Sequence, residues 1–195
     1  MNRKTASTQS RVEGGKARGV ALLGVFLAFI LMVGLVERMI PLDFIVPGVR
    51  LGFSNIVVLL AIYLFQTRYA LCLVVMKCAL LATLTGGVSS FIYSICGSLL
   101  SFAAMNLMVK HLGEKVGPVG VSVVGAICHI AGQLAVASLI LESANIFALM
   151  PPLMLLSGAS GVLVGIAVKT ALTRLPYLTR RMNQKKSKTK KDYPQ

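Results

Sequence analysis

The sequence predicts an all-α membrane protein, a bundle of six transmembrane helices with both termini in the cytosol. Of its 195 residues, 56% are hydrophobic and only 13% are charged, whereas soluble domains are nearer half apolar and a quarter charged. The mean hydropathy of +0.80 points the same way. The charges are also segregated, because residues 20–168 hold few ionisable side chains and both ends are basic. We therefore expect the lipid bilayer to surround the central part of the chain.

Composition divides the chain into three regions. Residues 1–18 are polar and basic, and we expect them to form a disordered cytosolic tail. A six-helix membrane domain should follow over residues 19–173, and a second basic cytosolic tail over residues 174–195. The net charge of +14 could also suit nucleic acid. However, a run of cations beside a membrane span is expected to lie on anionic lipid, so nucleic acid is not predicted as a partner.

Six apolar segments account for the expected spans, at residues 19–36, 54–65, 69–84, 88–109, 117–141 and 147–173. The second contains about a dozen apolar residues, which is short for a crossing. In transporters, short or interrupted spans are pointers to a binding site. Residues 37–53, which precede the short span, contain Pro41 and Pro47 and could form either an extracellular loop or a re-entrant segment.

The distribution of cations orients the predicted bundle. Six spans place both basic tails on one side of the membrane, and the positive-inside rule makes that side the cytosol. Arg68, Lys110 and Lys115 then also lie inside, whereas Arg38 and Arg50 are exceptions on the outside. We expect a multi-pass protein of the bacterial cytoplasmic (inner) membrane in this orientation.

Polar residues within or beside the spans are the candidates for a ligand site. Lys77 and His129 lie near the middle of their predicted helices, and Gln133 follows His129 by one turn. Arg50 and Asn55 lie at the outer end of the short second span. If these helices converge, the five side chains would line a cavity that is cationic on balance. Such a cavity suits a small-molecule ligand that carries a carboxylate or a phosphate.

Each of these residues also has a structural interpretation. Lys77 could snorkel to the cytosolic face, or pair with Glu37 or Asp43 to support folding. His129 and Gln133 could hydrogen-bond between helices, as polar residues in membranes often do. The small residues of segment 88–109 are more typical of a helix-packing seam than of a wall that lines a substrate.

Signatures of enzymes are missing from the sequence. Its two aspartates, Asp43 and Asp192, cannot form an aspartate-rich diphosphate–magnesium motif. No phosphate-binding glycine loop, HExxH or GxSxG motif is present. We therefore expect no catalytic residue, metal site or cofactor, and an ATP-driven step would need another subunit. An intramembrane enzyme that uses His129 as an acid or base is a weaker alternative, because His129 has no acidic partner within its span.

Five short motifs carry a resemblance to a known family. They are RLGFSN at 50–55, TGGVSS at 85–90, GSLLS at 97–101, GVSVVGA at 120–126 and HIAGQ at 129–133. In this order they resemble the family named both heptaprenyl diphosphate synthase component I and Gx transporter, over roughly residues 20–172. That family is similar to the substrate-binding S components of energy-coupling factor importers, which have six helices.

The resemblance implies two functions. In the importers, an alanine motif of the first helix docks on a transmembrane coupling subunit, and two separate ATPases supply energy. Ala17, Ala21, Gly24 and Ala28 are the candidates for that contact here. The first expectation is therefore a binding subunit that imports a small, partly anionic metabolite. The alternative is a non-catalytic membrane subunit that supports a soluble prenyl synthase in heptaprenyl diphosphate synthesis.

Overall fold

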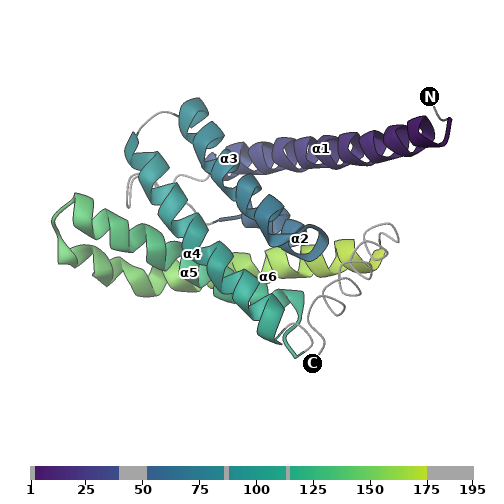
Figure 1. Ribbon diagram of the computed structural model, residues 1–195. Coiled ribbons are helices and arrows are strands. Elements are labelled where there is room, and N and C mark those ends of the chain that lie inside the picture. The colour runs from purple at the N-terminus through teal and green to yellow at the C-terminus, as the bar shows by residue number, and fades with distance from the viewer. Residues whose placement is uncertain (1–2, 40–51, 86–87, 113–114, 175–195) are drawn as a thin grey trace.

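The computed structural model describes an all-helical chain (Figure 1). It describes residues 3–39, 52–85, 88–112 and 115–174, without the side chains of residues 3–18, 38, 85 and 89. Arg50 and the rest of segment 40–51 lie outside the described residues. The elements are α1 (Arg3–Arg38), α2 (Asn55–Leu64), α3 (Thr67–Thr85), α4 (Val88–Leu112), α5 (Pro118–Ile140), the 3₁₀ helix η1 (Ala144–Leu149) and α6 (Met150–Arg174).

The short helix α2 lies at the centre of the bundle. It contacts all five other α-helices, and most of its ten residues are buried. A helix that is apolar on all sides is expected in such a buried position. With ten residues, α2 is about 15 Å long, so it reaches only halfway across a hydrocarbon layer of about 30 Å.

The other helices are long enough to cross a membrane. Five segments of the described chain have the length and apolar composition of a span, namely Gly19–Glu37, Thr67–Leu84, Ser90–Leu112, Pro118–Ile140 and Ala144–Arg174. Large apolar side chains such as Leu155, Leu139 and Leu163 are exposed on their outer faces, as expected for surfaces in lipid. The prediction of an all-α membrane protein is confirmed for the described residues. Six crossings remain a prediction, because α2 is short.

Glycines allow α4, α5 and α6 to pack closely. A Cβ atom on Gly132 of α5 would lie 3.0 Å from the Cα of Gly97 on α4. A Cβ atom on Gly165 of α6 would clash with the Cα of Val119 on α5. Small residues at such positions let helix backbones approach each other. The α4–α5 contact therefore supports the packing-seam interpretation for this part of segment 88–109.

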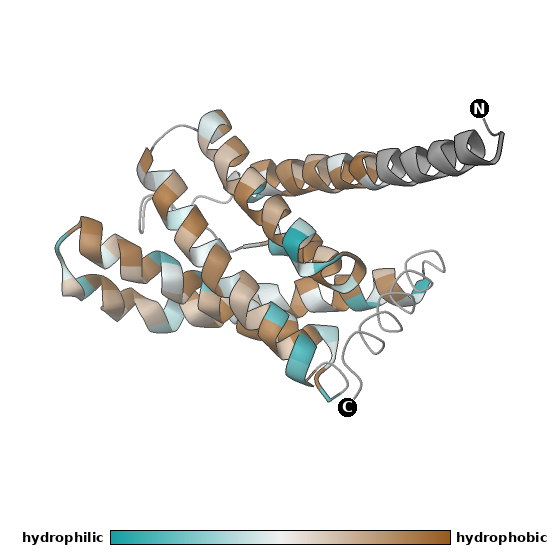
Figure 2. Ribbon diagram, in the orientation of Figure 1, coloured by the Kyte–Doolittle hydropathy of each residue, from teal (hydrophilic) through white to brown (hydrophobic). Residues whose placement is uncertain are grey.

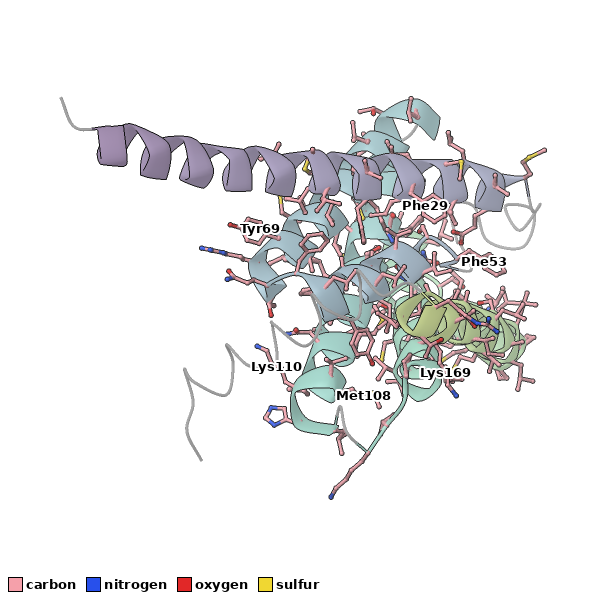
Figure 3. The ribbon with its side chains drawn as sticks, turned by 90° about the vertical axis from the view of Figure 1, so that its right-hand side faces the viewer. Phe29, Phe53, Tyr69, Met108, Lys110 and Lys169 are labelled. Atoms are coloured by element: carbon pink, nitrogen blue, oxygen red, sulfur yellow. The ribbon has the colours of Figure 1, made fainter. Side chains whose placement is uncertain are left out.

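Helix α1 lies along one edge of the bundle and packs on α2 and α3. Its N-terminal part projects beyond the other helices in two views at right angles (Figures 1 and 3). The ring of Phe26 meets Phe65 edge-on, with centroids 5.1 Å apart. Residues 3–18, which we expected to be disordered, continue α1 as helix. The physical reason is that this stretch has no proline, so a helix nucleated in the apolar segment can extend through it.

The polar ends of several helices gather at one end of the bundle. Figure 2 shows the hydrophilic residues mainly near helix ends, with hydrophobic residues between them. The hydroxyl of Thr67, at the start of α3, donates to Oδ1 of Asn106 near the end of α4 at 3.2 Å. The close contact of Gly165 with Val119 brings the start of α5 beside the last part of α6. The exposed cations of these segments are Arg68, Lys110, Lys115, Lys169 and Arg174, and Lys110 and Lys169 point outward in Figure 3.

Candidate functional site

Lys77 is fully buried near the middle of α3, with 1% of its surface exposed. Its Nζ atom donates to Oδ1 of Asn55 at 2.8 Å and to Oγ of Ser54 at 3.1 Å. The ammonium group therefore does not snorkel to a membrane face. A lysine in the membrane interior costs several kcal/mol unless polar partners hold it, and the first turn of α2 supplies such partners.

Asn55 links three helices at this level. It is the first residue of α2 and accepts the hydrogen bond from Lys77 of α3 through its carbonyl oxygen. Its Nδ2 atom donates to Oγ of Ser101 on α4 at 3.5 Å. Lys77 and Ser101 both lie near the middle of their helices. The N-terminus of α2 therefore lies at mid-bundle depth. From there, α2 runs toward the end of the bundle that carries the exposed cations.

Glu37, at the end of α1, contributes a buried carboxylate to the same place. It is 5% exposed. One of its oxygens accepts a hydrogen bond from the backbone N–H of Gly52, and the other accepts from the N–H of Ser54 at 3.3 Å. Anions are favoured at helix N-termini because unpaired N–H groups and the helix dipole point toward them. Ser54 thus connects two opposite charges, since its N–H faces Glu37 and its hydroxyl faces Lys77.

His129 and Gln133 form a pair on α5. Their Nε2 atoms lie 3.0 Å apart, and the direction of the hydrogen bond depends on the tautomer of the ring. Both side chains are buried, at 2% and 0% exposure. The predicted shared face is confirmed, because residues four apart on a helix lie one above the other.

Gly52 connects this pair with the cluster around Lys77. Its φ angle of 87° lies in the left-handed region that favours glycine. A Cβ atom there would lie 2.9 Å from Nδ2 of Asn55 and 3.1 Å from Cδ2 of His129. The backbone of Gly52 therefore fits between the two side chains. We call Glu37, Gly52, Ser54, Asn55, Lys77, Ser101, His129 and Gln133 the polar cluster.

The structure thus brings together four of the five predicted site residues. Asn55 and Lys77 are in direct contact, and His129 and Gln133 lie on the far side of Gly52. The position of Arg50 is outside the described residues. The described members of the polar cluster carry one acidic side chain, Glu37, and one basic side chain, Lys77. The cationic balance that we expected includes Arg50 and therefore stays a prediction.

Sequence reasoning missed the role of Glu37 in the polar cluster. It considered Glu37 only as a pairing partner for Lys77. The available signal was its place as the acidic residue that ends the first long apolar segment. Ser54 and Gly52 had a weaker signal, because a Gly-x-Ser-Asn sequence before an apolar run also suits an ordinary helix start.

The predicted partner-contact residues of α1 lie on an open face. Ala21, Gly24 and Ala28 are all exposed, and a Cβ atom on Gly24 would have no other atom within 4 Å. The side chain of Ala17 is not described. Bulky residues such as Val25, Phe29 and Met32 are exposed on the same helix. A single copy of the described chain therefore leaves this small-residue face uncovered.

The chemistry open to the polar cluster is binding through charge and hydrogen bonds. Among the described residues, no group of three or more His, Cys, Asp or Glu side chains is placed to hold a metal ion. The cluster offers an ammonium group, a carboxylate, two amide side chains and an imidazole inside a bundle of apolar helices. Fold and cluster together define a class: a multi-helix membrane protein with a buried, hydrogen-bonded polar centre.

The comparison with protein families identifies the group within this class. The chain matches the family heptaprenyl diphosphate synthase component I over residues 26–171. It therefore belongs to this family. The matched region includes every member of the polar cluster. Comparisons with curated proteins and with solved structures find no match.

Proposed function

We propose that the chain is the substrate-binding subunit of a membrane importer for a small, partly anionic metabolite. The observation that carries this proposal is the buried ammonium group of Lys77 at the N-terminus of a half-length helix in mid-bundle. Secondary transporters use such interrupted helices to direct polar backbone groups at a ligand near the membrane midplane. The half-length helix is thus the feature that favours transport over a purely structural bundle.

The residues of the polar cluster indicate the kind of ligand. Charged side chains inside membrane segments are rare and most often mark a path or a binding site. Lys77 can balance an anionic group, whereas Asn55, His129 and Gln133 can orient neutral polar groups by hydrogen bonding. Arg50 remains a proposed fifth member at the outer rim. This set fits a metabolite that combines one anionic group with donors or acceptors.

Energy for import would come from separate proteins. The sequence contains no phosphate-binding loop, so ATP hydrolysis is assigned to ATPase subunits that act through a coupling membrane subunit. The exposed face with Ala21, Gly24 and Ala28 is the proposed contact for the coupling subunit, together with Ala17 one turn earlier. Small residues at four-residue spacing allow a second helix to approach closely.

We also propose that both termini lie in the cytosol of a bacterial cell and that residues 174–195 lie on its inner membrane. In support, the exposed cations of α3, α4, α6 and the turn before α5 gather at one end of the bundle. The positive-inside rule assigns such an end to the cytosol. Helix α1 begins at the same end. Phe26 lies beside Phe65, just before the start of α3, whereas Gly34, nearer the end of α1, lies beside Leu81, near the end of α3.

The family name supports a second candidate function. As a component I, the chain would be a membrane subunit that assists a soluble synthase without carrying out prenyl transfer itself. The two aspartates of the sequence do not suffice for a diphosphate–magnesium site. In this alternative, the basic terminal segments would anchor the synthase at the membrane surface.

Co-purification separates the two candidates. The protein would be extracted gently from its native membrane through an affinity tag, and its partners would be identified by mass spectrometry. Importer function predicts ATPases and a coupling membrane subunit among the partners. Recovery of a soluble prenyl synthase without any ATPase would contradict the importer and support the alternative. The variant Gly24→Leu should lose the coupling subunit and keep its fold, because it alters an exposed position in the proposed contact face at which an added Cβ atom meets nothing within 4 Å.

A further inference from the structure

The two backbone N–H groups that bind Glu37 form a site suited to any carboxylate. The N–H of Gly52 meets one oxygen of Glu37 and the N–H of Ser54 meets the other. We call these two N–H groups the carboxylate cradle. The positive φ angle of Gly52, 87°, is a conformation that other residues rarely adopt. The cradle therefore depends on a backbone geometry specific to this position.

The surroundings of the cradle favour an anion. The start of α2 contributes the positive end of a helix dipole. Lys77 adds a full positive charge, only 1% exposed, which is bound to the hydroxyl of the same Ser54. A negative group in the cradle is therefore held in a water-poor interior, where charge interactions are stronger than at a surface.

A second, independent feature lies on the neighbouring helix α4. The hydroxyl of Ser98 is buried, at 2% exposure, and has no hydrogen-bond partner among the described residues. Ser98 lies one turn after Ser94, which contacts Cys78 of α3, and one turn before Ser101, which contacts Asn55 of α2. Residues at this spacing share a helix face. Ser98 is thus on the face of α4 that is turned toward Lys77 and Asn55.

A buried hydroxyl without a partner is unfavourable. It indicates that a polar group outside the described residues completes the site. We propose that the carboxylate cradle binds the carboxylate of a small ligand, and that Glu37 occupies the cradle as an internal competitor when the ligand is absent. The ligand is a monocarboxylate whose second polar group reaches Ser98. Its identity as the imported metabolite rests on the proposed function.

Displacement of Glu37 would also change the attachment of α1. In the described structure, the carboxylate of Glu37 ties the end of α1 to the start of α2. A ligand that takes its place releases this tie, although Gly34 and Ile30 still pack in the bundle. Occupancy of the site is thereby linked to the helix that carries the proposed contact face for a coupling subunit.

Chemical rescue tests the carboxylate cradle without knowledge of the ligand. The variant Glu37→Ala vacates the cradle, and sodium acetate is the probe, compared with sodium chloride at equal ionic strength. Acetate should raise the Tm of Glu37→Ala by about 3 °C, because it binds the folded state. The wild-type protein should respond less than Glu37→Ala, since acetate must first displace the carboxylate of Glu37 from the cradle. The variant Ile30→Ala is the matched control, because it opens an apolar cavity on the same helix, at a residue with 0% exposure.

Two further variants make the test decisive. Glu37→Ser leaves a smaller space and is probed with formate, in case Glu37→Ala does not fold. Adding Lys77→Gln to either variant should reduce the rescue by at least half. An equal response of wild-type, Ile30→Ala and Glu37→Ala to acetate would overturn the proposal. So would failure of both anions to stabilise or recover the two Glu37 variants.

The outcome of the chemical-rescue experiment does not depend on whether the protein is part of an importer. Rescue without any ATPase partner would establish the cradle and refute the proposed function. ATPase partners without rescue would support the proposed function and refute the cradle.

Discussion

The ammonium nitrogen of Lys77 lies 2.8 Å from the side-chain oxygen of Asn55, which places a buried cation at the first residue of a helix. A cation is disfavoured at a helix N-terminus by the helix dipole, typically by 0.3–1 kcal/mol. Oxygen ligands from Asn55 and Ser54 offset this cost. The carboxylate of Glu37, on the other side of Ser54, adds the opposite charge.

Replacement of Lys77 should weaken both stability and binding. Lys77→Ala removes a buried charge and leaves Asn55 and Ser54 without its hydrogen bonds, and we expect the free energy of unfolding to fall by about 2–3 kcal/mol. The protein should still fold, because the apolar core around α2 is unchanged. Thermal unfolding in detergent checks this value, and Lys169→Ala is the control, since Lys169 is exposed. Equal stability of the two variants would show that Lys77 contributes nothing through its contacts.

Arg50 provides a separate test of the proposed outer rim. We expect Arg50→Ala to lower the amount of ligand that stays bound during purification, with little change in Tm, because a residue at the proposed outer rim should contribute little to folding. Native mass spectrometry measures the occupied fraction. If both Arg50→Ala and Lys77→Ala keep the occupancy of the wild-type protein, the assignment of the binding site is wrong.

Gly52 should tolerate no side chain. Gly52→Ala combines a φ angle of 87° with a Cβ atom 2.9 Å from Nδ2 of Asn55, and we expect a loss of roughly 1–3 kcal/mol in unfolding free energy. Gly158→Ala is the matched control on α6, where a Cβ atom meets nothing within 4 Å. In that helix, alanine should be neutral or stabilising by about 0.5–1 kcal/mol. A larger loss for Gly158→Ala than for Gly52→Ala would contradict this account of the cluster.

Gly24 should matter for assembly and not for folding. Gly24→Leu adds an apolar side chain at an exposed helix position where a Cβ atom would meet nothing within 4 Å, so the Tm of the isolated protein should be unchanged or slightly higher. Recovery of the coupling subunit in a pull-down should fall at least tenfold, because a larger side chain keeps a partner helix at a distance. Normal recovery of that subunit with Gly24→Leu would place the contact elsewhere.

The sequence was sufficient for the fold class and for much of the polar cluster. Hydropathy and charge segregation predict an all-helical membrane protein, because lipid leaves few alternatives for a long apolar chain. Helical spacing predicts the shared face of His129 and Gln133, since it depends on one helix alone. Lys77 stands out because a charge within an apolar segment is rare.

The remaining features depend on contacts between segments far apart in the chain. Glu37 reaches Gly52 and Ser54 only because α1 packs beside α2, and no periodic pattern encodes that packing. The length of α2 was also uncertain from sequence, because the polar residues on both sides of its apolar run are compatible with a longer helix. The structure ends it at Leu64, where Phe65 turns to an extended conformation.

Native mass spectrometry of the gently extracted protein tests the central claim most directly. The account predicts a species with a small bound anionic metabolite, in complex with a coupling membrane subunit and ATPases, and loss of the metabolite in Lys77→Ala. A wild-type protein that carries no small molecule and associates only with a soluble prenyl synthase would contradict it.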